Sequence, residues 1–181
     1  MPSHYKGSAT ELRALNAYIN LTRAANTLGS TLAAQLEAHG LTVSQFGTLE
    51  ALFHLGPLCQ HEIADKLLKS GGNITMVIGN LEKRGWVSRK RVANDQRQLR
   101  IHLTPKGRRQ VAKVLPAHVK AITRAMRTLS NEEQESLRKL SRKLGSNGSA
   151  GLSRMPLRGV PAGILRLQVS RNAAIARGRP R

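Results

Sequence analysis

The chain has 181 residues, enough for one well-buried domain, and its 30 Lys and Arg against 10 Asp and Glu give a net charge of +20. This excess favours polyanionic partners, with nucleic acid ahead of an anionic membrane, and no apolar run reaches the roughly 18 residues that a membrane-spanning helix requires. One cysteine, Cys59, excludes an internal disulfide framework, and the N-terminal region lacks a signal-peptide core, so we expect a cytoplasmic protein.

A long helix is predicted at the start of the chain, over residues 8–40. Ser8 and Glu11 have the spacing of a capping box, in which each side chain accepts from the other residue's backbone amide. Apolar residues then recur at helical spacing until Gly40, a residue type that often ends helices. Such a helix is about 45 Å long, so a small core cannot cover it without a partner surface.

Two shorter helices are predicted next. Thr42 and Gln45 form a second capping box, and Gly56-Pro57 ends the helix that they start. A helix from about Gln60 to Leu68 follows, and the Ser70-Gly71-Gly72-Asn73 sequence after it is typical of a turn.

A further helix is predicted from Asn73 to Arg84, with Ser70 as its N-cap. Its apolar residues recur at i, i+3, i+4 and i+7 and give it one buried face. They are Ile74, Val77, Ile78 and Leu81. The side chains predicted to point outward are Asn73, Thr75, Met76, Asn80 and Lys83. Together with the preceding helix and turn, this forms a helix-turn-helix whose second helix can lie in a major groove of DNA.

A basic hairpin is predicted after this helix. Strand-like residues lie on both sides of the polar turn Asn94-Asp95-Gln96. The region 83–109 holds ten Lys or Arg and one acid, Asp95. Two amphipathic helices follow, the first opened by Pro105 with a possible kink at Pro116, the second opened by the pair Ser130 and Glu133.

The order of these motifs resembles the MarR family of winged-helix regulators, from about Leu12 to Leu144. The resemblance is carried by Asp95-x-Arg97 followed by Leu103-Thr104-x-x-Gly107 after a helix-turn-helix. Ser70-Gly71-Gly72-Asn73-Ile74-Thr75 and Leu81-Glu82-Lys83-Arg84-Gly85 also resemble a subgroup, some of whose members respond to quinone-like aromatics.

The resemblance implies a mainly α fold with a small two- or three-stranded wing. Residues 8–40 and 106–144 would be dimerisation helices, and residues 41–105 would form the winged helix-turn-helix lobe. The protein would be a homodimeric regulator, most often a repressor, that binds a pseudo-palindromic double-stranded operator and is released by a small aromatic or phenolic effector. Beyond Gly145 the resemblance ends, and residues 145–181, with seven Arg and no acid, are expected to form a basic, disordered tail.

The candidate DNA-binding residues lie in two groups, with bases assigned to the helix and phosphates to the wing. By the family resemblance, Arg97 reaches the minor groove or its phosphates and Asp95 shapes the wing tip. The full set is Ser70, Asn73, Thr75, Met76, Asn80, Lys83, Arg89, Arg91, Asp95, Arg97 and Arg100. The effector cleft of the family would be lined here by Tyr18, Phe46 and Phe53, and a plain place in the hydrophobic core is the alternative for each phenylalanine.

Other functions find less support in the sequence. Cys59, at the expected start of a short helix whose dipole favours a thiolate, makes a redox sensor an alternative, and an inert buried thiol is the plainer interpretation. His54, Cys59, His61 and Glu62 match no established zinc spacing, so no metal or other cofactor is expected. No catalytic constellation is present, so an enzyme is not expected. A winged-helix module for protein or structured-RNA binding stays open as a second class of function.

Overall fold

The computed structural model describes the backbone of residues 5–92 and 95–151, and their side chains except for 92–98 and 147–151. These residues form two compact units that divide between Thr128 and Leu129. The first unit holds five helices and a small sheet, and the second holds α6 (Asn131–Gly151). The prediction of a mainly helical fold with a small wing is confirmed.

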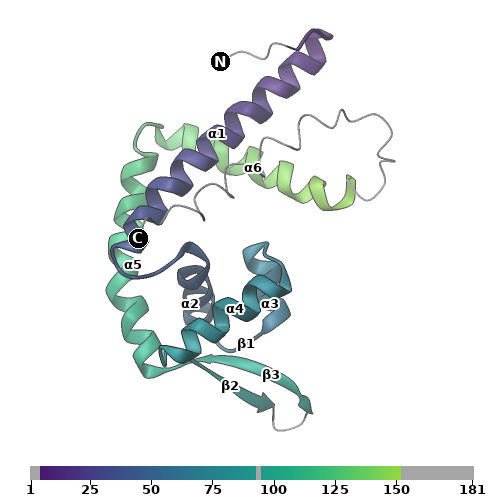
Figure 1. Ribbon diagram of the computed structural model, residues 1–181. Helices are drawn as coiled ribbons and strands as arrows, with labels where there is room; N and C mark the ends of the chain where they lie inside the picture. Colours follow the sequence, from purple (N-terminus) through teal and green to yellow (C-terminus); the bar gives the residue numbers. More distant parts are fainter. Residues whose placement is uncertain (1–4, 93–94, 152–181) are drawn as a thin grey trace, which may run out of the picture. The chain divides into compact units, whose positions relative to one another are not determined.

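The first unit begins with α1 (Ala9–Glu37), and α5 (Pro105–Met126) packs beside it. Between them in sequence lie α2 (Val43–Leu55), α3 (Gln60–Leu67) and α4 (Gly71–Lys83), which pack together against the sheet (Figure 1). The sheet is antiparallel, in the order β1-β3-β2. Its strands are β1 (Leu58–Cys59), β2 (Val87–Val92) and β3 (Asp95–Leu103), and Figure 1 shows β2 and β3 extending from the helices as a hairpin.

The core lies between α2, α3, α4, β3 and α5. Leu49, Ile63, Ile74, Ile78 and Val114 are each completely buried in it. The buried face of α4 consists of Ile74, Val77, Ile78 and Leu81, as their spacing predicts. Because apolar burial fixes this face, the opposite face of α4 must lie toward solvent.

The helix starts agree with the predicted caps. The Ser8–Glu11 and Thr42–Gln45 capping boxes are both present, and Ser130 and Glu133 bond reciprocally before α6. The Ser70 hydroxyl accepts from the Asn73 backbone N–H at 3.4 Å, which confirms the N-cap.

The start of α4 and the end of α6 differ from the sequence predictions. α4 starts at Gly71, two residues before the predicted start at Asn73, so Gly71 and Gly72 are helical and not part of a turn. Both glycines have open space where a Cβ would stand, so packing does not oppose the helical backbone there. The helix α6 continues past Gly145 to Gly151. The third strand, β1, has only two residues, too few to recognise as a pattern.

Candidate nucleic-acid interface

The outward face of α4 is one part of the candidate surface. Thr75, Met76, Asn80 and Lys83 are exposed, and the Met76 side chain is 61% exposed although it is apolar. Ser70 lies at the start of the helix with its hydroxyl used as the cap. Because Cα–Cβ bonds lean toward the helix N-terminus, residues of the first turns are the ones that reach farthest past that end.

Asn73 does not lie as predicted. Its side chain is predicted to point outward, but the residue is half-buried and its Oδ1 atom has almost no contact with solvent. Asn73 precedes the buried Ile74 by one residue and the buried Val77 by four, so it lies at the edge of the buried face of α4. Thr75, two residues later, is exposed, as predicted.

A contact between the two helices of the helix-turn-helix could not be anticipated from the sequence. Gln60, the first residue of α3, donates from Nε2 to the Thr75 hydroxyl oxygen at 2.6 Å. The Thr75 hydroxyl in turn donates to the Gly71 carbonyl oxygen at 2.9 Å. An outward side chain of α4 is therefore held from the neighbouring helix.

The wing supplies the second part of the surface. Arg91 and Arg100 are exposed, as predicted for residues that contact phosphates. Arg89 differs, because its guanidinium lies 3.3 Å from the Glu82 carboxylate and its backbone N–H donates to the same group. Glu82 therefore fixes β2 against the end of α4, and sequence reasoning missed it. The side chains of Asp95 and Arg97 lie outside the described residues.

Two further contacts attach the wing and α4 to the rest of the unit. The Arg84 guanidinium lies 3.7 Å from the centre of the Trp86 ring and donates to the Gly40 carbonyl oxygen at 2.7 Å. On the other side, the single hydrogen of the Thr104 hydroxyl is directed to the Gly85 carbonyl oxygen at 2.8 Å, with the Trp86 carbonyl oxygen at 3.1 Å as a second acceptor. The Thr104 hydroxyl also accepts from the Gly107 N–H at 3.0 Å. The Thr104-x-x-Gly107 motif is thus the junction between the wing and α5.

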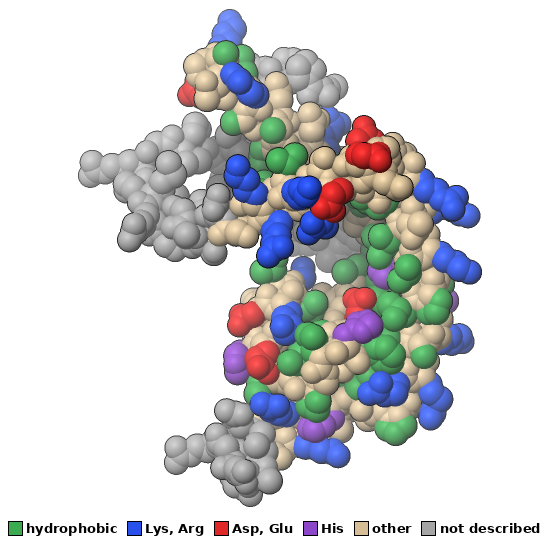
Figure 2. All heavy atoms as spheres, turned by 180° about the vertical axis from the view of Figure 1, so that it is seen from behind, with side chains coloured by type: hydrophobic (Ala, Val, Ile, Leu, Met, Phe, Trp, Pro, Cys, Tyr) green, Lys and Arg blue, Asp and Glu red, His purple; other side chains and the backbone are tan. Residues whose placement is uncertain are grey.

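Positive charge continues from the wing onto α5. Figure 2 shows Lys and Arg side chains spaced along this helix, which lies at the right in that view. The helix contains no acid. Its basic residues are Lys106, Arg108, Arg109, Lys113, Lys120 and Arg124, all exposed. Burial lowers the pKa of His102 at the base of the wing, and the charges of the nearby Lys90 and Arg100 lower it further. The positive charge of this region therefore comes from its Lys and Arg side chains.

The three residues predicted to line an effector cleft differ in their exposure. Tyr18 is 52% exposed on α1, Phe46 is buried, and Phe53 is half-buried beneath the Arg108 guanidinium. Phe46 lines a cavity of about 180 Å³ where α1, α2 and α5 meet. The other lining residues are Gly29, Leu32, Leu36, Val43, Gly47, Glu50 and His118.

His118 is a cavity residue that the sequence does not reveal. Its ring centre lies 4.7 Å from that of Phe46, and its Nδ1 lies 2.8 Å from the Gln35 Oε1. Burial lowers the pKa of His118, and the nearby Glu50 carboxylate opposes this effect.

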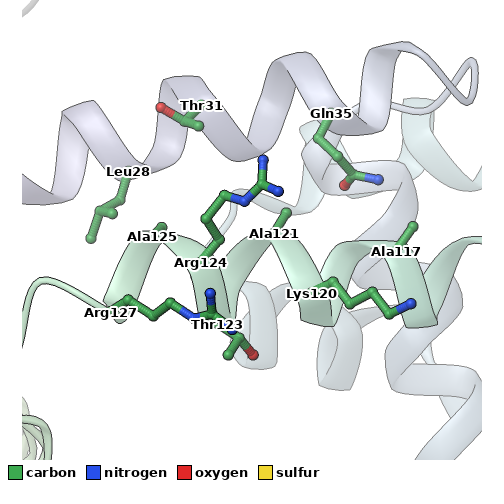
Figure 3. A pocket seen from close by; sticks show the side chains of 10 residues that line it. All are labelled: Leu28, Thr31, Gln35, Ala117, Lys120, Ala121, Thr123, Arg124, Ala125 and Arg127. Atoms are coloured by element: carbon green, nitrogen blue, oxygen red, sulfur yellow. The ribbon is translucent and has the colours of Figure 1, made fainter.

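A larger groove of about 900 Å³ runs between α1 and α5. Figure 3 shows Leu28 and Gln35 pointing from α1 toward α5, and Ala121 and Arg124 pointing from α5 toward α1. Three alanines of α5 line this groove, together with Lys120 and, just after the helix, Arg127.

Cys59 is the N-terminal cap residue of α3, as expected, and only 6% of it is exposed. Its backbone N–H donates to the Glu62 carboxylate at 2.7 Å, and this bond lowers the pKa of Glu62. Among the residues whose placement is described, no three His, Cys, Asp or Glu side chains converge as metal ligands. No helix in the same part of the chain is both long and apolar enough to cross a membrane.

Comparison with known proteins agrees with this surface. The sequence profile described as MarR family matches residues 39–98. The chain is 35% identical to the HTH-type transcriptional regulator YkoM of Bacillus subtilis, over 74% of this chain and 86% of YkoM. It is 30% identical to the HTH-type transcriptional regulator MhqR of Bacillus subtilis, over 75% of this chain and 93% of MhqR. The structure of Sco3205 of Streptomyces coelicolor, a MarR family regulator in complex with DNA, is similar with a TM-score of 0.69, 26% identity, and coverage of 81% of this chain and 92% of Sco3205.

Proposed function

Because this chain belongs to the MarR family of transcriptional regulators, we propose that it represses transcription as a homodimer that binds a pseudo-palindromic operator. The observation that carries the proposal is the joint placement of α4 and the wing. The helix α4 contacts β2 and is joined to it by the Glu82–Arg89 ion pair, and both elements carry exposed polar or basic side chains. One part can therefore enter a major groove while the other binds phosphates. Sco3205, a relative of the same fold, is solved with DNA.

Exposed apolar side chains on the long helices support the proposal that the chain forms a dimer. In α5, Val119 and Ile122 are 50% and 38% exposed, and in α6, Leu140 and Leu144 are 66% and 61% exposed. In the described part of α1, Leu36 is the one buried residue of 29. Helices of this length with such a pattern need a partner to bury their apolar residues. Two α4 helices related by a two-fold axis would then enter successive major grooves about 34–36 Å apart.

Release by a small aromatic effector is the third element of the proposal. The cavity beside Phe46 has the size of a small ring compound, apolar walls, and two polar groups, Glu50 and His118. It lies where the long helices α1 and α5 meet α2, which packs on the DNA-reading helix α4. The dimer would have two forms that differ in the spacing of the two α4 helices. A ligand in this cavity would shift the equilibrium between them if its affinity for one form were higher than for the other.

The deciding experiment is selection of a duplex from a randomised DNA pool by the full-length protein. We expect an inverted repeat with half-site centres about one helical turn apart, bound by two copies of the chain. Asymmetric enriched sequences bound by one copy would contradict the homodimer. Enrichment of no sequence would contradict operator binding and favour a module for protein or RNA.

The division of labour between helix and wing is tested on the same duplex. Asn80→Ala should cost roughly 1–3 kcal/mol on the selected duplex and little on a scrambled one. Arg97→Ala, with Arg91→Ala as its matched variant on the described part of the wing, should weaken binding to both duplexes. Each Arg variant should also lower the log–log salt slope by about one for every phosphate that it no longer binds. Loss of sequence preference in Arg97→Ala alone would make the wing the reader.

A further inference from the structure

The hydrogen-bonding capacity of Thr75 is almost used up inside the protein. A hydroxyl has one hydrogen to donate, and Thr75 gives it to the Gly71 carbonyl oxygen at 2.9 Å. One of its lone pairs accepts from Gln60 Nε2 at 2.6 Å. Toward DNA, Thr75 can therefore donate no hydrogen bond, and what remains is its methyl group and one acceptor position.

The orientation of the Gln60 amide follows from its neighbours. Both atoms that face it, the Thr75 hydroxyl oxygen and the Gly71 carbonyl oxygen, are acceptors, because the Thr75 hydrogen is already directed to Gly71. Only the amide nitrogen of Gln60 can occupy that place, so exchanging the Oε1 and Nε2 positions would break the bond to Thr75.

Gln60 also decides which way the Thr75 methyl points. Threonine in a helix divides between two side-chain rotamers, one of which bonds the carbonyl four residues earlier. The Gln60 bond is made only by the rotamer seen here, whose Oγ1 lies at Gly71. Thr75 is exposed on the face of α4 that the operator would meet, so a fixed rotamer is a fixed direction for its methyl group.

We propose that Gln60 is a positioning residue for sequence reading, which fixes the Thr75 methyl so that it recognises the 5-methyl group of one thymine in each half-site. This rests on the operator binding proposed above. Contact with the thymine methyl is an apolar mode of base recognition in the major groove, and it needs no donor from Thr75. Gln60 acts through Thr75, and not through its own contact with a base.

The test replaces thymine with deoxyuridine, which lacks only the 5-methyl group, at each position of the duplex selected by the full-length protein. For the wild-type protein, one replacement per half-site should weaken binding about three- to five-fold, the effect of burying one methyl group. Thr75→Ser, which keeps the hydroxyl and lacks the methyl, should not distinguish thymine from deoxyuridine at that position.

Gln60→Met has a side chain of similar length without a donor. It should lower the thymine preference at the Thr75 position to less than about two-fold, with the melting temperature and the affinity for scrambled DNA unchanged. Gln60→Leu, which can neither donate nor accept a hydrogen bond, should do the same and serves if Gln60→Met folds poorly. Thr75→Val places a methyl group at both γ positions, so it should restore the preference in the Gln60→Met background.

The outcomes separate the two proposals. An unchanged thymine preference in both Gln60 variants would overturn the positioning role. A selected duplex in which no thymine methyl depends on Thr75 would also overturn it, while leaving operator binding intact. A wild-type protein that selects no duplex would instead refute the operator binding on which this inference rests.

Discussion

The Cα atom of Gly107 lies against the backbone carbonyl of Trp86, so closely that any side chain at position 107 would overlap the carbonyl oxygen. The Leu103 side chain closes the same site at 2.9 Å from where a Cβ would stand. Trp86 precedes β2 and Gly107 lies in the first turn of α5, so this contact brings the wing and α5 together. Only glycine therefore fits at this position of the family motif without a steric clash.

We therefore expect Gly107→Ala to destabilise the protein by about 1–3 kcal/mol, because backbone on one side of the added methyl cannot move away. Gly79→Ala is the matched control, since Gly79 is also helical and has nothing within 4 Å of a built Cβ. That variant should be neutral or more stable by up to about 1 kcal/mol. Chemical denaturation of both would measure the difference, and equal stability would contradict the packing argument.

Glu82 should limit the contribution of Arg89 to DNA binding. The two side chains are 38% and 35% exposed, so their 3.3 Å ion pair adds little to stability, and Glu82→Gln should change it by less than about 1 kcal/mol. The released Arg89 guanidinium should raise affinity for scrambled DNA and steepen the log–log salt slope by about one.

A matched double variant distinguishes this from a general change in charge. Addition of Arg89→Ala to Glu82→Gln should return the salt slope to the wild-type value. Glu135→Gln in α6, which breaks another surface ion pair, should leave the slope unchanged. A steeper slope that persists without Arg89 would show that Glu82 repels phosphates directly.

Stability should fall in mild acid because of His118. Burial lowers its pKa, so the folded protein binds a proton less readily than the unfolded chain, which titrates near the ordinary value of about 6.5. The unfolded chain holds more protons in this range, so the unfolding free energy decreases as pH is lowered from 7.5 to 5. The pKa of His102 is lowered too and acts in the same direction, whereas the carboxylates with lowered pKa contribute at lower pH.

His118→Gln should therefore remove part of that pH dependence, and His102→Gln another part. The exposed His61 provides the control, because its replacement by Gln removes a titratable group without opening a buried site. Denaturant unfolding at pH 7.5, 6.5, 5.5 and 5 measures the slopes. An unchanged slope in His118→Gln would mean that the histidine beside Phe46 titrates alike in the folded and unfolded protein.

Oxidants should not act through Cys59. The residue is only 6% exposed, and thiol oxidation requires access to the sulfur as well as a thiolate. Cys59→Ser should leave any release of DNA by peroxide or by an electrophilic quinone unchanged, as measured by fluorescence anisotropy. A wild-type response that disappears in this variant would identify a thiol sensor and contradict the inert role.

Local features of the fold were predictable from the sequence, and contacts between distant residues were not. The caps at Ser8, Thr42 and Ser70 depend on neighbours three residues away, so spacing is sufficient to find them. The predicted start of α4 at Asn73 was wrong because a double glycine is typical of a turn, yet here Gly71 and Gly72 begin the helix.

The bonds of the candidate site show the same limit. Gln60 and Thr75 are 15 residues apart, and Glu82 and Arg89 are seven apart across a change from helix to strand. No periodicity relates such pairs, since they meet only after α3, α4 and β2 have packed. The sequence could therefore indicate which side chains of α4 are exposed, apart from Asn73, but not which are already held by a neighbour.

The contacts of Arg84 with Trp86 and Gly40 matter for the construction of hybrid regulators. Arg84, at the end of α4, stacks on Trp86 and bonds the Gly40 carbonyl, 44 residues earlier in the turn after α1. The backbone at Gly40 has a φ of 67°, which a residue with a side chain would adopt only with strain. A graft that joins foreign DNA-reading segments to this scaffold at residue 41 would separate these bonded partners. If the junction is placed before His39, Gly40 and Arg84 come from the same parent protein and their hydrogen bond can form.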